Sequence, residues 1–466
     1  MMLTNQAALL LLLLLPSALY AETKTLLLED VLSAAEKSFP ALLAAEQRRI
    51  ATEGDFISTQ GAFDTVVKSQ SRWSVIGLYE NQNYDVSVEQ PTPYWGTTFF
   101  GGWRRGTGDY PIYDGKNITA TDGEYRVGVN VPLWRNREID RRRAGLKQAE
   151  LAQLIAGHDI DQALLDIRRQ AAHRYWDWVL AAQRLLIVEH LLQIAEERNA
   201  GILERVAAGD IPQFEALDNQ RAIIERQERR VAAQRMLEQS AIQLSLYWRN
   251  EKGEPLMPVP EQLPRTFPQE PNVDTDVHKA WAQAQEQRPE LKRLGVQTEQ
   301  TATELALQKN QQAPAIDLSV VGALDNGKGK TGLNRDELYV GLNFDFPIQQ
   351  RAAKGKAQTA AANLQRLKWE INLAENRIAA DIKDAISRIA AARQRLSLIK
   401  EQQKTAEELE KGERERFDLG ASNILFVNMR ELATGDAAIM AIEASSNLYK
   451  AHADFLAALG TQVLGK

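Results

Sequence analysis

The sequence predicts a mainly helical protein that carries a small β-sheet, and two patterns support this prediction. Several short segments alternate strictly between apolar and polar residues, which is the period of a β-strand. Two much longer stretches, 135–208 and 350–419, contain no proline. Their apolar residues recur about every 3.5 positions, which is the coiled-coil period. Such helices are too long for an ordinary globular domain.

The composition excludes several classes of function. The 466 residues include 62 acidic and 56 basic side chains, five histidines and no cysteine. Without cysteine there are no disulfides, no thiolate metal sites and no lipid anchor on an N-terminal cysteine. A formal net charge of -6 gives no basic footprint for nucleic acid. No nucleophile, histidine cluster or phosphate loop stands out, so we expect neither an enzyme nor a cofactor or metal site.

The start of the chain has the pattern of a secretory signal peptide. Leu9–Leu15 is an unbroken leucine run, and Pro16, Ser17 and Ala18 follow it, with Ala21 just before Glu22. The run is too short to span a bilayer comfortably, which disfavours a membrane anchor. We therefore expect residues 1–21 to be removed on export and no lipid anchor to replace them.

The rest of the chain is organised as two copies of one plan. Residues 22–254 form the first copy, 273–466 form the second, and a proline-rich linker at 255–272 joins them. The segment 127–133, VGVNVPL, has its counterpart in VGLNFDFPI at 340–348. Each copy is expected to contain helices, two strands and a long helical hairpin.

The predicted strands are about 63–90 and 123–133 in the first copy and about 315–324 and 338–348 in the second. In 123–133, for example, Tyr125, Val127 and Val129 fall on one face, with Arg126 and Asn130 on the other. Segments of this length, apolar on one side and polar on the other, are typical of membrane barrels. A soluble sheet packed on a helix would give the same periodicity, so both interpretations remain open at this point.

The predicted helical hairpins are 135–250 and 350–460. At 1.5 Å per residue the long helices reach roughly 110 Å and 100 Å. Four strands cannot close a barrel, because the smallest barrels have about eight. An open sheet edge in lipid is prohibitively costly, so at least two chains must share the sheet if it spans a membrane.

At this point the sequence resembles the TolC-type outer-membrane efflux family over about residues 25–460. The resemblance rests on paired motifs in a fixed order around the long helices. These are Pro40-Ala41-Leu42 and Pro289-Glu290-Leu291, Gly128 and Gly341 in the strands, and Arg205/Gly209 and Arg416/Gly420 at the hairpin turns. It implies a homotrimer with a twelve-stranded barrel, four strands per chain, that continues into a twelve-helix periplasmic coiled-coil tunnel.

The resemblance also implies the function. Such a protein is the channel, or exit duct, of a tripartite efflux or type I secretion system in the outer membrane of a Gram-negative-type cell, with a large periplasmic portion. Its partners would be outer-membrane lipid, a periplasmic membrane-fusion adaptor, and an inner-membrane pump or ABC transporter. The alternative is a periplasmic coiled-coil adaptor or scaffold without a pore. The sequence does not specify the transported substrate.

Two groups of residues are candidates for function. Family members narrow the tunnel just past the hairpin turns, and the corresponding positions here are Glu215 and Asp218, then Phe426 and Met429. Three alternatives stay open: an acidic ring, an apolar ring that gates by dewetting, and plain helix N-terminal charges. The candidate adaptor-docking turns, which must also cap the helices, are Arg205, Gly209, Asp210, Pro212, Arg416, Gly420, Ser422 and Asn423.

Overall fold

The computed structural model describes residues 24–111, 117–264, 266–329 and 335–461. The chain divides into two compact units. The first unit comprises residues up to Ala34, Arg174–Glu270 and Ile399–Ser446, and the second comprises Ala35–His173, Pro271–Leu398 and the residues from Asn447 on. The expected signal peptide at 1–21 lies outside the described residues.

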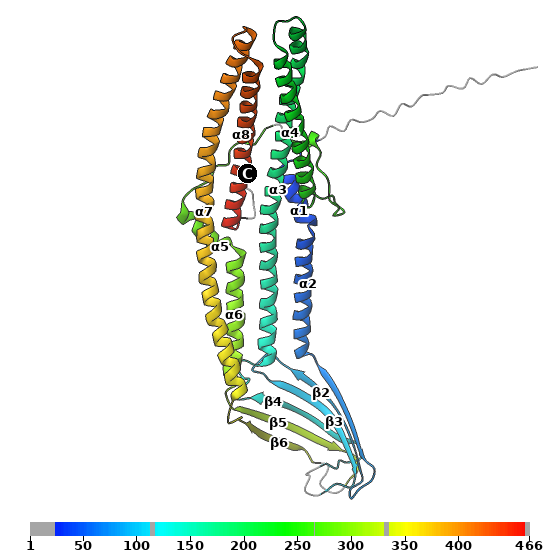
Figure 1. The fold of residues 1–466 in the computed structure, drawn as a ribbon. Helices are drawn as coiled ribbons and strands as arrows, with labels where there is room; N and C mark the ends of the chain where they lie inside the picture. Colours follow the sequence, from blue (N-terminus) through cyan, green and yellow to red (C-terminus); the bar gives the residue numbers. More distant parts are fainter. Residues whose placement is uncertain (1–23, 112–116, 265, 330–334, 462–466) are drawn as a thin grey trace, which may run out of the picture. The chain divides into compact units, whose positions relative to one another are not determined.

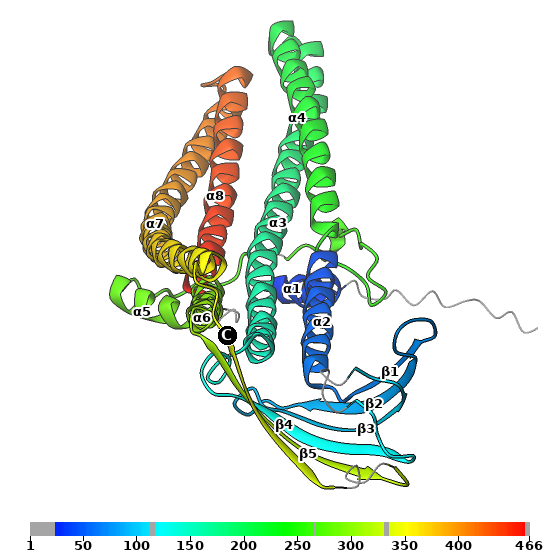
Figure 2. The same cartoon turned by 90° about the horizontal axis from the view of Figure 1, so that it is seen from below.

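The second unit contains one six-stranded antiparallel sheet, seen from two directions in Figures 1 and 2. The strands pair strictly in chain order, so each strand lies beside its neighbours in sequence. They are β1 (Val66–Ser74), β2 (Asn81–Pro91), β3 (Thr98–Gly108), β4 (Gly123–Pro132), β5 (Ala315–Asn326) and β6 (Glu337–Asp345).

The prediction of four strands per chain is therefore wrong. The segment 63–90 holds two strands and the turn between them, and β3 lies between the two expected strands of the first copy, where no strand was expected. The reason is the glycine content of β3, which resembles a loop composition. At Gly102, an added Cβ would lie 2.8 Å from the carbonyl oxygen of Val86. Glycine is needed there because the neighbouring strand comes close.

The helices around the sheet follow the expected plan. The second unit holds α2 (Pro40–Gln60), α5 (Val277–Gln287), α6 (Pro289–Asn310) and the first parts of α3 (Arg141–Ala207) and α7 (Arg351–Asp418). Helix α3 begins later than the expected residue 135, because Asp140 Oδ1 accepts hydrogen bonds from the backbone N–H groups of Arg142 and Arg143 and so caps the helix there.

The first unit contains two long antiparallel helix pairs. One pair is the second part of α3 with α4 (Gln213–Ser245), and the other is the second part of α7 with most of α8 (Ile424–Leu459). The short helix α1 (Leu28–Ser38) lies mainly in the same unit. By length and composition one stretch of α3 could cross a membrane, but 44% of that stretch is buried inside the protein.

The expected apolar stripes of α3 and α7 are confirmed as packing faces. On α3 the buried residues include Trp178, Val188 and Leu192, and on α7 they include Ile378 and Ile382. Helix α4 differs from these two. Its apolar residues Phe214, Leu217, Ile224 and Val231 are exposed, and its buried face includes Asn219, Ala222, Ile223, Arg226, Ala233 and Leu237.

Candidate functional site

The sheet has one apolar face. Because paired residues in an antiparallel sheet point to the same side, a row can be followed across all six strands. One such row is formed by Val67, Val88, Gly101, Val127, Gly322 and Leu338. Its large members, like Val340 and Phe344 on the same face, are exposed rather than covered by a helix. This face therefore offers a continuous apolar surface to the surroundings.

The opposite face is polar and carries ion pairs. Arg104 on β3 binds Glu124 on β4 through two hydrogen bonds, of 3.0 and 2.9 Å, and the Glu124 side chain is fully buried. Asp85 on β2 pairs with Arg126, two strands away. Exposing such a polar face to water is favourable, whereas exposing a continuous row of apolar side chains to water is unfavourable. Two such faces are typical of a sheet that lies between an apolar and an aqueous phase.

The two hairpin turns are built alike. In the first turn, Gly209 has φ +80° and the Asp210 N–H donates to the Arg205 carbonyl at 2.9 Å. In the second turn, Gly420 has φ +72° and the Ala421 N–H donates to the Arg416 carbonyl at 2.8 Å. Both are left-handed glycine caps of the preceding helix, which side chains with a Cβ adopt only under strain.

The remaining turn candidates also have structural partners. Pro212 is the residue before the first turn of α4. The Asn423 side chain accepts a hydrogen bond from the Phe426 N–H at 3.1 Å, and Ser422 donates to Glu413. The Arg205 guanidinium lies 5.3 Å from the ring centre of Phe417, which connects the two turns by a cation–π contact. Capping is thus shown for Gly209, Gly420 and Asn423, and adaptor docking stays a prediction.

The four candidate constriction residues divide into two kinds. The Glu215 carboxylate accepts a hydrogen bond of 2.8 Å from the Ile424 N–H, so it caps the first turn of α8, and Asp218 is partly buried with Arg221 3.9 Å away. Phe426 and Met429, in contrast, are exposed on α8. Within the first unit, Glu215 therefore joins the two helical hairpins, and the apolar pair is available for contacts outside the chain.

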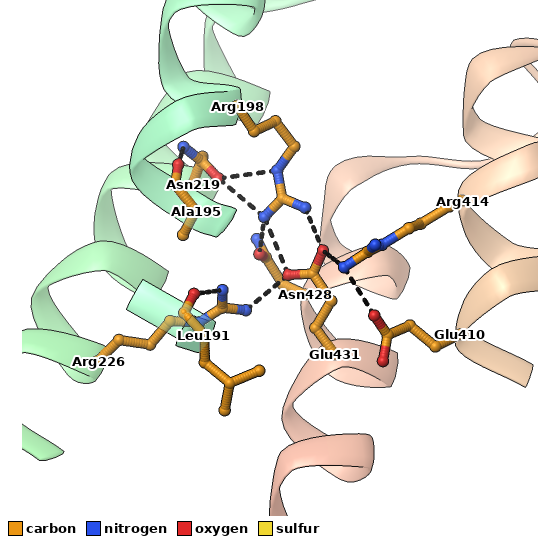
Figure 3. Close-up of polar contacts among 9 residues, drawn as sticks. All are labelled: Leu191, Ala195, Arg198, Asn219, Arg226, Glu410, Arg414, Asn428 and Glu431. Atoms are coloured by element: carbon orange, nitrogen blue, oxygen red, sulfur yellow. Dashed lines mark hydrogen bonds and ion pairs between the residues drawn. The ribbon is translucent and has the colours of Figure 1, made fainter. Parts of the chain in front are cut away.

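A buried ion network joins the same two hairpins farther from the turns (Figure 3). Its centre is Glu431 on α8, whose side chain is fully buried. The carboxylate accepts hydrogen bonds from Arg198 on α3 at 2.6 Å, Arg226 on α4 at 2.8 Å and Arg414 on α7 at 3.1 Å. Four helices thus contribute to one charged cluster, which connects both hairpins of the unit.

Neutral groups complete the network. Arg198 also donates to the side-chain oxygens of Asn428 at 2.6 Å and Asn219 at 3.2 Å, and Arg226 donates to the Leu191 carbonyl at 2.6 Å. Burial raises the pKa of Glu431, but the hydrogen bonds and charges of Arg198 and Arg226 outweigh it and hold the pKa below its usual range. The carboxylate is therefore ionised at neutral pH.

This network was not predicted from the sequence. Its residues come from four helices, and polar residues at packing positions look like ordinary surface charges when only one helix is considered. One sequence feature could have indicated the network. The position that follows Leu192 and Ala195 in the apolar stripe of α3 is occupied by the charged residue Arg198. Among the described residues, no group of three or more acidic or histidine side chains could hold a metal ion.

Comparison with known proteins identifies the fold. No family model and no curated protein matches the sequence. Solved structures do match. The Vibrio cholerae outer membrane protein VceC is 14% identical, with a TM-score of 0.66 over 93% of this chain and 96% of that one. The Neisseria gonorrhoeae outer membrane channel MtrE is 15% identical, with a TM-score of 0.65 over 93% and 89%.

The chain has the TolC-type channel fold. A third structure of this kind, the Campylobacter jejuni outer membrane channel CmeC, is 13% identical and gives a TM-score of 0.63 over 93% of this chain and 85% of that one. The three similar proteins are described as channels or as an outer membrane protein, and none as an enzyme. At these identities the similarity shows the TolC-type fold alone.

Two exposed apolar stripes on the helices of the TolC-type fold lack a partner within the described chain. On α2 the stripe is Leu43, Ile50 and Ile57, and on α4 it is Leu217, Ile224 and Val231. In both stripes the residues are seven positions apart, which is the coiled-coil repeat. A helix that exposes such a seam is expected to pack against another helix. These two surfaces therefore fit further helices outside this chain.

Proposed function

We propose that the protein is the exit duct of a tripartite efflux or type I secretion system in the outer membrane, and that it acts without enzymatic chemistry. The observation that supports this most strongly is the two-faced sheet. Its apolar face matches the lipid-facing side of a membrane barrel, and its charged face matches a wetted lumen. In this proposal the helices form the periplasmic tunnel, and the signal peptide directs export.

The duct is a homotrimer in this proposal. One sheet with open edges is not stable in lipid, because each unpaired backbone N–H or C=O group there costs several kcal/mol. Sharing the barrel between copies removes these edges. The exposed heptad stripes on α2 and α4 support the same conclusion, because packing against neighbouring copies would bury them. The two-copy internal plan of 22–254 and 273–466 supplies each protomer with two hairpins.

The hairpin turns are the proposed contacts for a periplasmic adaptor, which couples the duct to an inner-membrane pump or ABC transporter. The observation behind this is the exposure of apolar residues next to the turns, including Phe214, Leu419 and Phe426. For the constriction we propose Phe426 and Met429 as an apolar ring, because Glu215 is engaged in capping α8. Asp218 follows Glu215 by three positions, on the same face of α4.

The test compares the same substitution on the two faces of one strand. Val127→Arg places a charge on the apolar face of β4, and Asn130→Arg places it on the polar face. An arginine facing lipid at the bilayer midplane costs about 2–4 kcal/mol, whereas a lumen-facing arginine costs little. We expect the Val127 variant to be lost from washed outer membranes and the Asn130 variant to accumulate normally.

The measurement is the amount of each variant in carbonate-washed membranes, together with the sensitivity of a deletion strain to a panel of toxic compounds. Equal accumulation of both variants, or full recovery of the protein in buffer without detergent, would contradict the duct and favour the periplasmic scaffold. Unchanged export in Gly209→Val and Gly420→Val variants that still insert would count against docking at the turns.

A further inference from the structure

The two edge strands of the sheet determine how copies of the chain can join and so how wide the pore is. Strands β1 and β6 are the edge strands, and no strand among the described residues pairs with their outer sides. Strand β1 leaves α2 and runs away from the helices, and β6 runs back toward α7. If β1 of one copy meets β6 of another, the two strands are therefore antiparallel, like every other neighbouring pair in the sheet.

The side chains of the two edges match in one register. Register must keep apolar residues on the apolar face, because a shift by one residue would turn every side chain over. Pairing Val67 with Phe344 places Trp73 opposite Leu338, since both pairs are separated by six positions. All four are on the apolar face and strongly exposed, at 69%, 67%, 60% and 72% respectively. We call this joint between β1 of one copy and β6 of another the seam, and it would cover part of each of the four side chains.

The polar faces of the two edges are complementary in charge. On β1 this face presents the basic residues Lys68 and Arg72, and on β6 it presents the acidic residues Glu337 and Asp345. In the register above, Lys68 lies diagonally opposite Asp345, and Arg72 lies diagonally opposite Glu337. Diagonal neighbours across antiparallel strands are within reach of long side chains. Attraction between opposite charges thus favours this seam over two like edges meeting.

Strands β2 and β3 are integral parts of the sheet rather than an appended hairpin. Both are hydrogen-bonded on two sides along most of their length. On the polar face, Lys68 on β1 binds Glu89 on β2 at 2.6 Å, and Asp85 on β2 reaches over β3 to Arg126 on β4. The Phe100 ring of β3 occupies the space above Gly128, where an added Cβ would lie 2.6 Å from it.

We propose that the copies join edge to edge through β1 and β6 and that all six strands of each copy line the pore. This inference rests on the proposed homotrimeric duct. Three sheets of six strands give an eighteen-stranded barrel instead of the twelve strands expected from the resemblance. With strands about 4.8 Å apart and tilted by about 40°, its diameter is roughly 36 Å, against roughly 24 Å for twelve strands.

Cysteine cross-linking tests the seam against a background without native cysteine. The variant Val67→Cys/Phe344→Cys, oxidised in washed outer membranes of cells that express the full chain, should give reductant-sensitive dimers and trimers on a denaturing gel. Val67→Cys/Val88→Cys joins β1 to β2 within one chain and should cross-link without a dimer. Val67→Cys/Val127→Cys should not cross-link, because β2 and β3 separate these strands.

The outcomes separate the proposals. A cross-link between positions 67 and 127 would show that β1 and β4 are adjacent and would overturn the six-strand contribution. Absence of dimers for Phe344 and for the two-residue shifts, Leu342→Cys and Phe346→Cys, would overturn the β1–β6 seam. A missing link from position 67 to 88 would show that β1 does not pair with β2 and would overturn the six-strand contribution. Compound export by the reduced variants is measured in parallel. Export without the seam cross-link leaves the duct standing, and the cross-link without pore conductance leaves only the seam.

Discussion

Replacing Glu431 with glutamine should loosen the connection between the two helical hairpins. Glu431→Gln keeps the size and shape of the side chain and removes its charge. Arg198 and Arg226 would then face an amide, although the Arg226 side chain is almost fully buried and Arg198 is mostly so. Removing one partner of a buried ion pair leaves an uncompensated charge and costs about 3–5 kcal/mol.

Hydrogen–deuterium exchange measures this cost locally. A loss of 3–5 kcal/mol corresponds to amide exchange roughly 100- to 4,000-fold faster around position 431, wherever exchange follows opening of the helix. The matched control is Asp436→Asn on the same helix. Asp436 pairs with Arg229 at 2.8 Å, but both side chains are about 40% exposed, so the expected cost is only about 0–1 kcal/mol.

Similar exchange rates in the two variants would refute the reasoning, because they would show that burial of Glu431 adds nothing to its ion pairs. A Glu431 variant that is as protected as the unchanged protein would refute it as well. Acceleration confined to α8 and the facing parts of α3 and α4 is the result that the structure predicts.

Three further outcomes are expected. Because the folded-state pKa of Glu431 is lowered, the contribution of its carboxylate to stability is present above the unfolded pKa and is lost as pH falls through the folded pKa. Exchange protection, corrected for intrinsic rates, should therefore stay constant between pH 8 and 5.5. It should fall only below about pH 4.5. Chemical denaturation should show that Gly435→Ala destabilises the first unit by about 1–3 kcal/mol, because the new Cβ would lie 2.3 Å from Leu191 Cδ1. In the same assay the control Gly412→Ala should be neutral or stabilising, because nothing lies within 4 Å of its new Cβ. Equal effects of the two substitutions would contradict this. Gly209→Val should cost about 1–2 kcal/mol in left-handed backbone strain and fray the end of α3, which limited proteolysis at the turn detects; unchanged cleavage would contradict it.

The long helices and their turns could be predicted from the sequence because their signals are local. Absence of proline over 350–419, a regular apolar stripe, and a glycine at each turn specify a hairpin without reference to the rest of the chain. The described bounds of α7 and α8, Arg351–Asp418 and Ile424–Leu459, lie close to the expected hairpin at 350–460. The TolC-type fold followed from the order of these elements.

The strand count and the buried network could not be predicted in this way. Gly101, Gly102 and Gly106 lower the strand signal of β3, and the reason for glycine at 102 exists only once β2 lies beside it. Glu431 meets its partners from α3 and α4 only in the folded unit. On α4 the apolar residues Leu217, Ile224 and Val231 are exposed, so its apolar stripe does not indicate the face that is buried in the described chain.

The unpaired outer sides of β1 and β6 bear on how the protein is made. A sheet that needs counterparts on other molecules to close cannot be completed by a newly synthesised subunit on its own. In the proposed duct, oligomerisation must therefore accompany or precede entry into lipid, and the rate of biogenesis should rise steeply with the supply of subunits. A single subunit with a damaged edge strand would then prevent the intact subunits of the same oligomer from closing the barrel.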